Sequence, residues 1–375
     1  MVQDGRYARC MKGSRTMKHL IRLLALTTMG SLIVGCGSSG SSYSMLSTGQ
    51  SFKQAKVNSK IDMLWTIDNS SSMTPLQTNM TNNFNSFMST FITKGYDFHL
   101  AVTSTEAYLA GSRWANNPAY SKFSDGVSTH TGVFDIVPGT SNLINTFVAN
   151  ASLGANGSGD ERAFSSIKAS LNDTQNTNFL RPDSFLAVII LSDEDDFSDP
   201  NRAEYSWTFR NGIADHSYSD PGLESVDSYV SYLDTLTGTT NAATRRYSVS
   251  AITVDTQTCL NSHSNQSPSA IIGQRYIQIA NDTQGVIGSV CDTSYAAALA
   301  AIESRILELG TQFYLNAPPI ETSIVVTVNN VTVPNDPDNG WTYNSAANSI
   351  MFHGTAIPEA GADINVAFDP AKLSF

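Results

Sequence analysis

The sequence predicts an α/β fold, with a mainly parallel central sheet flanked by helices and a small C-terminal all-β module. Three observations predict it. Short, continuously apolar runs, such as FLAVIIL at 185–191, alternate with longer segments of helical spacing, which is typical of strands covered by helices on both faces. From about residue 313 the helical spacing stops, and turn residues separate short strand-like runs. The 375 residues suffice for one large domain and a smaller one.

The elements of the large domain follow from this alternation. The run at 61–67 has the length of a strand, and the helix expected at 73–92 places Leu76, Met80 and Phe84 on one side. The polar and aromatic stretch 104–135 is expected to be an irregular insert. Further strands are expected at 98–102, 185–191 and 247–254, and further helices at 162–171, 226–236 and 295–309.

The C-terminal module is expected over residues 313–375. Turn residues such as PDNG at 337–340 separate strands expected at 324–328, 331–333, 350–352 and 364–368. This pattern predicts an Ig-like or similar β-sandwich fragment. We expect it to pack on the main domain or on a partner, because a domain of about 60 residues is only marginally stable alone.

The first 36 residues have the features of an export signal. Met17 is the expected true start, Lys18 and Arg22 supply positive charge, and a short apolar run ends in LIVGC at 32–36. This ending resembles the lipobox of bacterial lipoproteins, which implies lipidation of Cys36 and a lipid-anchored protein of the cell envelope, at the outer membrane or cell surface. The Ser/Gly-rich segment 37–56 would then be a flexible tether. The alternative is an ordinary secretory signal with a chance cysteine.

The charge of the chain is unevenly distributed. The formal net charge is −11, and beyond residue 35 the chain carries 32 acidic and 16 basic residues, or −16. Nucleic-acid binding requires a basic surface, so we expect no nucleic-acid partner. An acidic body suits cation binding or serves solubility.

The four cysteines are at positions 10, 36, 259 and 291, and none forms a CxxC pair. A zinc site is therefore not indicated. Export to an oxidising compartment favours a disulfide between Cys259 and Cys291. The alternative is two separate thiols.

Oxygen-bearing side chains follow two of the expected strands. Asp68, Ser70 and Ser72 form a D-x-S-x-S loop directly after the strand at 61–67, and Asp193 follows the strand at 185–191. Ligands bind at the carboxyl ends of strands in open α/β sheets, so these four side chains are expected to meet. Carboxylate and hydroxyl oxygens suit a hard cation, Mg²⁺ or Ca²⁺.

This arrangement resembles the metal-ion-dependent adhesion site of von Willebrand factor A-type (VWA) domains. The resemblance covers residues 57–312 and implies a Rossmann-like domain whose metal is completed by an acidic residue of a protein partner. The family usually supplies a middle threonine, whereas this chain has GSGDE at 157–161. Ser158, Asp160 and Glu161 are the candidates to replace it. The alternative is a degenerate site in which Asp68 only caps the next helix.

The acidic run after Asp193 and the function of the chain each allow more than one interpretation. The acidic run at 194–196 is interpreted as a solvated loop, with a second cation site as the alternative. For function, we expect a non-enzymatic binding or adhesion module, since no GxSxG or HExxH motif occurs. The alternatives are a metal-dependent hydrolase on a Rossmann-like sheet and a structural envelope lipoprotein whose metal only stabilises the fold.

Overall fold

The computed structural model describes residues 50–54, 57, 60–111, 117–127, 131–200 and 217–371. The export signal, Cys36 and the first part of the expected tether lie outside these residues. No helix among the described residues has the length and apolar character needed to cross a membrane.

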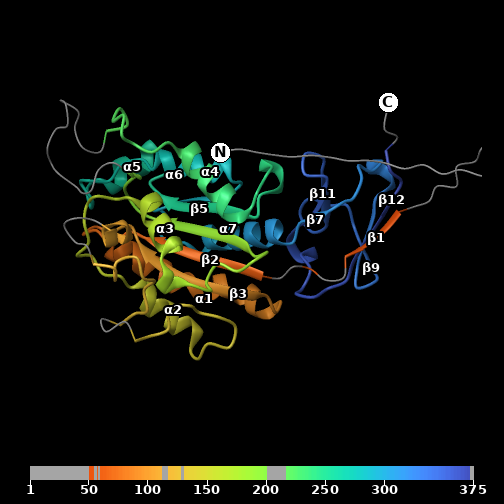
Figure 1. Cartoon of the computed structure of the whole chain (residues 1–375), viewed down its shortest axis with the longest axis horizontal. Coiled ribbons are helices and arrows are strands. Elements are labelled where there is room, and N and C mark those ends of the chain that lie inside the picture. Colours follow the sequence, from red (N-terminus) through yellow and green to blue (C-terminus); the bar gives the residue numbers. More distant parts are fainter. Residues whose placement is uncertain are drawn as a thin grey trace, which may run out of the picture. The chain divides into compact units, whose positions relative to one another are not determined.

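A five-stranded parallel sheet forms the centre of the large domain (Figure 1). Its order is β3-β2-β4-β5-β6, and every neighbouring pair is parallel. The strands are β2 (Lys60–Ile67), β3 (Asp97–Ser104), β4 (Phe185–Leu191), β5 (Tyr247–Thr253) and β6 (Ile287–Ser289). The predicted mainly parallel sheet is confirmed.

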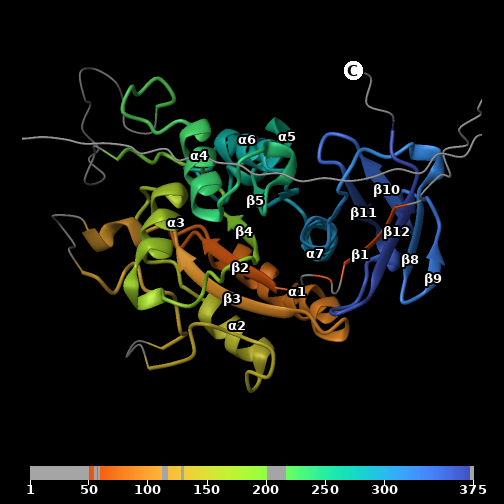
Figure 2. The same ribbon diagram turned by 45° about the vertical axis from the view of Figure 1, so that its right-hand side comes forward.

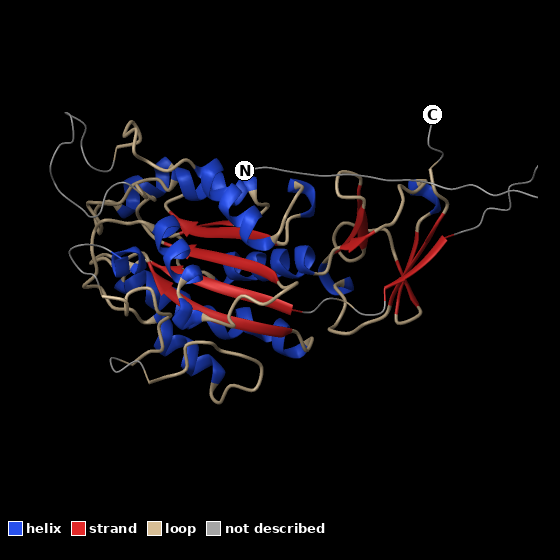
Figure 3. Ribbon diagram, in the orientation of Figure 1, coloured by secondary structure: helices blue, strands red, loops and turns tan. Residues whose placement is uncertain are grey.

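Helices cover both faces of this sheet (Figure 3). Alternate residues of a strand point to opposite faces, so Trp65 of β2 joins one apolar cluster and Leu64 joins the other. The first face is covered by α1 (Thr74–Thr93), α2 (Leu143–Ala151), α5 (Gln257–His263) and α7 (Ala296–Gly310). The second face is covered by α3 (Ala163–Asn172), α4 (Val226–Thr237) and α6 (Gln274–Asp282).

The long helix α1 has local reasons for its ends and its orientation. Pro75 stands in its first turn, where proline's fixed φ favours a helix start. Gly95 follows its end with a φ of 71°, the left-handed conformation that commonly terminates helices. The buried side carries Phe84 and Phe87, whose rings meet that of Trp65 edge to face at 6.2 and 5.5 Å. This packing fixes α1, and the loop before it, against β2.

The C-terminal module contains two antiparallel sheets. One has the order β1-β12-β8-β9 and the other β10-β11-β7. The strands are β1 (Gln50–Gln54), β7 (Phe313–Tyr314), β8 (Val325–Val328), β9 (Val331–Val333), β10 (Trp341–Asn344), β11 (Ser349–Phe352) and β12 (Ile364–Phe368).

The expectation of a flexible tether over 37–56 is wrong for residues 50–54. These residues form β1, which pairs with β12 near the other end of the chain. The pairing partner lies more than 300 residues away, so no local pattern indicates this strand. Strands from both ends of the described chain therefore meet in one sheet.

The module packs against the amino ends of the central strands (Figure 2). Tyr96, which precedes β3, donates a hydrogen bond to the carbonyl of Pro358. A single apolar cluster runs from Trp65 in the central sheet to Val326 in the module. The module is thus joined to the large domain by a shared core, and the carboxyl ends of the central strands lie at the opposite edge.

Candidate functional site

The central sheet has one topological switch point, at β2. The chain passes from β2 to β3 on one side, and β4 then pairs with β2 on the other side. Ligands bind at such points, beyond the carboxyl ends of the strands. Ile67 and Leu191, the last residues of β2 and β4, are direct partners. Asp68 and Asp193 therefore leave the sheet side by side.

Asp68 is fully buried and held by two hydrogen bonds. The backbone NH of Ser70 donates to Oδ1 at 2.7 Å, and the hydroxyl of Ser192 donates to Oδ2 at 2.7 Å. Asp68 does not cap the next helix, because α1 has Met73 at its N-cap position and no side-chain cap bond. The helix-cap alternative is wrong, and the carboxylate belongs to the strand-end loop.

The three other predicted residues lie close to one another. The hydroxyls of Ser70 and Ser72 are 3.3 Å apart, and Ser72 donates to Oδ1 of Asp193 at 3.0 Å. Nε2 of His263 lies 2.9 Å from Oδ2 of the same aspartate, and donates because a carboxylate only accepts. The structure therefore brings together the four predicted side chains, and adds His263, which no sequence spacing indicated.

The three candidates in the GSGDE segment have different surroundings. The Ser158 hydroxyl accepts a hydrogen bond from the backbone NH of Asp160. The Asp160 carboxylate is bonded to Arg162 at 2.6 Å and to the Tyr108 hydroxyl at 2.9 Å. Glu161 is 1% exposed and lies beside the Thr105 hydroxyl, which lowers its pKa, but neither its carboxylate oxygens nor that hydroxyl makes a well-formed hydrogen bond. Of the three, Glu161 is the side chain whose oxygens are unsatisfied.

The loops that carry these residues are tied together by side chains that the sequence did not single out. Glu106 accepts from the amide of Asn69 at 2.8 Å and from the backbone NH of Ser158. The side-chain amide of Gln77 donates to the carbonyl of Asp68 at 2.9 Å. A Cβ on Gly157 would lie 2.5 Å from the Asn69 side chain, so any larger residue here would require the Asn69 amide, which Glu106 holds, to move.

The acidic run at 194–196 is buried, and its interpretation as a solvated loop is wrong. Asp195 and Asp196 are 0% exposed. Asp195 accepts from the Tyr218 hydroxyl at 2.7 Å, and Asp196 pairs with Arg275 at 3.0 Å. Both partners come from distant parts of the chain, so the local sequence resembles a surface loop.

The electrostatics of this edge are dominated by buried carboxylates. Burial raises the pKa of Asp68, and the charge of Asp193 raises it further. Burial likewise raises the pKa of Glu161 well above its usual value, with a second contribution from Asp68. Burial raises the pKa of Glu194 to about 8 despite a hydrogen bond from Ser269. Each shift means that the negative charge is poorly compensated at this edge.

These residues fit a cation in their chemistry. A buried carboxylate without a compensating positive charge is costly, and the group beside Glu161 is the neutral hydroxyl of Thr105. No three His, Cys, Asp or Glu side chains converge to hold a metal ion within the described ranges. A cation at this place would therefore depend on the hydroxyls of Ser70 and Ser72 as well as on carboxylates.

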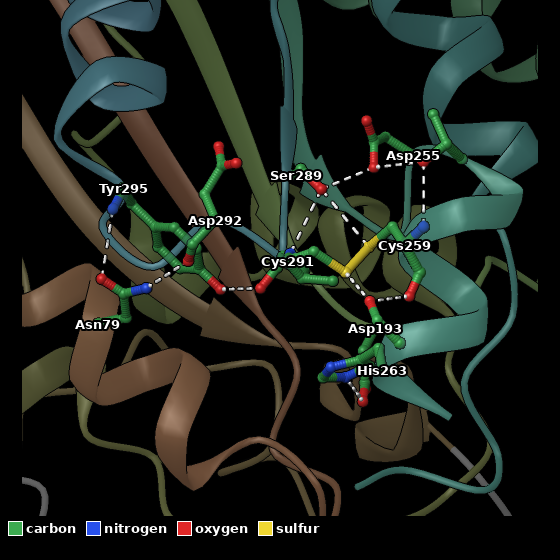
Figure 4. The surroundings of a disulfide bond; sticks show 12 residues. Asn79, Asp193, Asp255, Cys259, His263, Ser289, Cys291, Asp292 and Tyr295 are labelled. Carbon is green, nitrogen blue, oxygen red and sulfur yellow. Dashed lines mark hydrogen bonds and ion pairs between the residues drawn. A yellow bond between two sulfur atoms is a disulfide. The ribbon is translucent and has the colours of Figure 1, made fainter. Parts of the chain in front are cut away.

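The predicted disulfide between Cys259 and Cys291 is confirmed, with a Cα–Cα distance of 5.6 Å. It joins α5 to the residues after β6 and lies in the same neighbourhood as Asp193 and His263 (Figure 4). Ser289 donates to the carboxylate of Asp255 at 2.6 Å beside the bond. The crosslink therefore belongs to the surroundings of the site.

No protein-family model matches the sequence, and a comparison with curated proteins found no match. Among solved structures, the pilus adhesin SpaC from Lactobacillus rhamnosus GG, in its open conformation, aligns with 84% of the chain at 13% identity and a TM-score of 0.39. Proximal thread matrix protein 1 from the mussel byssus aligns with 71% at 12% identity and a TM-score of 0.36. The pilus adhesin RrgA from Streptococcus pneumoniae aligns with 85% at 8% identity and a TM-score of 0.30.

The chain covers 39% of the SpaC structure, 51% of the byssus protein and 57% of RrgA. Superpositions with such low scores carry no argument about function.

Proposed function

We propose that this chain is a lipid-anchored VWA-type protein that binds one divalent cation, Mg²⁺ or Ca²⁺, and uses it to bind a protein partner. Asp68 and Asp193 are the carboxylate ligands in this proposal, and Ser70 and Ser72 are neutral hydroxyl ligands. The observation that supports it most is the meeting of these two buried carboxylates at the switch point of the sheet, where the described residues provide neither with an Arg or Lys partner.

Glu161 completes the proposed site in place of the middle threonine. Its two unsatisfied oxygens suit a hydrogen bond from a water molecule on the cation. Asp160 is excluded from this role by its bonds to Arg162 and Tyr108.

The proposed ligand set leaves the cation available to a partner. Two carboxylates just neutralise a divalent ion, and the hydroxyls add no charge. Mg²⁺ and Ca²⁺ take about six or more oxygen ligands, so the four protein side chains leave the coordination shell incomplete. A free coordination position can therefore accept a carboxylate, which agrees with the acidic partner residue that the VWA resemblance implies. A partner whose binding depends on the cation distinguishes this function from a purely stabilising metal.

Within the described residues, the first strand and the proposed site lie at opposite edges of the central sheet. The chain enters the described unit through β1, in the module at the amino edge of the central sheet. The site lies at the carboxyl edge, across the 8 residues of β2, or about 26 Å of strand. A lipid on Cys36 would precede β1 in the sequence, so the proposed anchor and the proposed site are on different segments of the chain.

Isothermal titration with Mg²⁺ and with Ca²⁺ tests the cation site. Wild-type protein should bind one ion, and Asp68→Asn should bind none at millimolar concentrations. Asp183→Asn is the matched control, because Asp183 is 82% exposed at the amino edge of the sheet. Equal binding by wild type and Asp68→Asn would contradict the proposal.

The anchor and the partner have separate tests. Cys36→Ser should release the protein from membranes and prevent incorporation of labelled palmitate. Partner capture from envelope extracts should require the cation, should fail with Asp68→Asn, and should be reduced by a competing acidic peptide. Capture that survives both the chelator and the substitution would contradict metal-dependent binding.

A further inference from the structure

The short helix α5 is held mainly by contacts outside itself. It has seven residues, Gln257–His263, and its first turn is capped by the Thr256 hydroxyl, which accepts from the NH of Cys259 at 3.2 Å. Helices this short are not stable alone in water. The disulfide from buried Cys259 to Cys291 fixes the helix to the residues after β6.

The same helix carries the side chain that contacts Asp193. Cys259 and His263 are four residues apart and therefore share one side of the helix. Figure 4 shows the ring of His263 beside the Asp193 carboxylate, close to the disulfide. His263 is 7% exposed, so its hydrogen bond to Asp193 is shielded from water.

The two oxygens of Asp193 have different partners. Oδ1 accepts from Ser72, which belongs to the same proposed ligand set, whereas Oδ2 is bonded to His263. The backbone carbonyl of Asp193 accepts from the NH of Ile271 at 3.2 Å, which holds the main chain but not the carboxylate. The orientation of the carboxylate therefore depends on His263 on the side away from the serine loop.

We propose that His263 is a positioning residue for the cation site, and that the Cys259–Cys291 disulfide holds it against Asp193. The cation part of this inference rests on the proposed function. Reduction of the disulfide by a dithiol transfers two electrons and two protons, giving two cysteine thiols and the oxidised, cyclic reagent. The release of α5 then frees His263, the Asp193 carboxylate loses its fixed orientation, and the affinity for the cation falls.

The role of the hydrogen bond is tested by two variants of the full chain. His263→Gln keeps an amide donor of similar reach, whereas His263→Leu keeps bulk without a donor. Hydrogen bonds to a metal ligand change metal affinity by about 10–100-fold. We expect the Kd for Ca²⁺ or Mg²⁺ to rise at least about tenfold in His263→Leu and much less in His263→Gln. Equal losses in both variants would indicate a merely structural role and overturn the positioning role.

The role of the disulfide is tested by reduction, followed by measurement of Kd. Two free thiols confirm reduction, and folded protein is verified by circular dichroism. Reduction should weaken cation binding in wild type and have little further effect in His263→Leu. An unchanged Kd in reduced wild type, or an equal additional loss in His263→Leu, would overturn the proposed coupling.

A measurement without metal separates this inference from the proposed function. In chelator and at constant pH, reduction should shift the NMR signals of the His263 ring, because the ring leaves Asp193. Unchanged ring signals would overturn the coupling even if a cation binds. Shifted signals in a protein that binds no cation would support the coupling and reject the metal site.

Discussion

The two edges of the central sheet differ in whether every buried acidic side chain named here has a basic partner. At the amino edge, the fully buried Asp62 pairs with Arg181 at 2.7 Å, and the same guanidinium also pairs with Asp97. At the carboxyl edge, Asp68 and Glu161 are just as buried and have no basic partner among the described residues. The protein therefore neutralises its buried acid at the amino edge with its own guanidinium. At the carboxyl edge it does so for Asp160 and Asp196, through Arg162 and Arg275, but not for Asp68 and Glu161.

Removal of the positive charge at the amino edge should have the largest effect on stability. Arg181→Met leaves Asp62 buried without its partner, and such a change costs about 3–5 kcal/mol. Urea unfolding should show this loss, while cation affinity stays near the wild-type value. Arg246→Met is the control, because its pair with Asp183 is exposed and contributes at most about 1 kcal/mol. Similar losses in both variants would contradict the contrast between buried and exposed pairs.

Addition of a cation should have the next largest effect on the free energy of unfolding, because the cation would bind the carboxylates at the carboxyl edge of the sheet. A ligand at 100 times its Kd stabilises the native state by about 2.7 kcal/mol. Wild-type protein should gain this stabilisation with Mg²⁺ or Ca²⁺ and lose it in chelator, as measured by thermal unfolding. Asp68→Asn should show no gain. A gain of equal size in that variant would place the binding site elsewhere.

Neutralisation of Glu161 should have the smallest effect on stability. Burial raises the pKa of Glu161, so the folded, metal-free protein disfavours the charged form of this side chain, and a neutral amide removes no favourable interaction. Glu161→Gln should therefore change the stability of metal-free protein by less than about 1 kcal/mol, but should weaken cation binding. A large loss of stability in chelator would show that the Glu161 carboxylate makes a stabilising contact with another residue of the protein, and would remove it from the proposed site.

Local pattern was sufficient to predict the elements that form the sheet edge. The apolar runs of β2 and β4 and the helical spacing of α1 led to Asp68, Ser70, Ser72 and Asp193, and the structure brings these side chains together. A strand that is buried on both faces has a continuous run of apolar residues. The residue that follows such a strand lies at the carboxyl edge of the parallel sheet.

The parts that could not be predicted depend on distant contacts. Helices α2, α5 and α6 were not expected, and two of them have nine residues and one has seven, so their periodicity is weak. Within the buried acidic run, Asp195 and Asp196 are bonded to Tyr218 and Arg275, which lie further along the chain. His263 reaches Asp193 from 70 residues away. No spacing rule connects such residues before the fold is known.

The pairing of β2 on both sides has a mechanical consequence if the proposed anchor and the proposed partner site are both present. Tension between the membrane and the partner would enter at Gln50 and leave at Asp68, along the backbone of β1 and β2. β2 is paired along its length with β3 on one side and with β4 on the other. A pull along β2 would load these hydrogen bonds together, in shear, so the strand that leads to the site is held against such a pull by both of its neighbours.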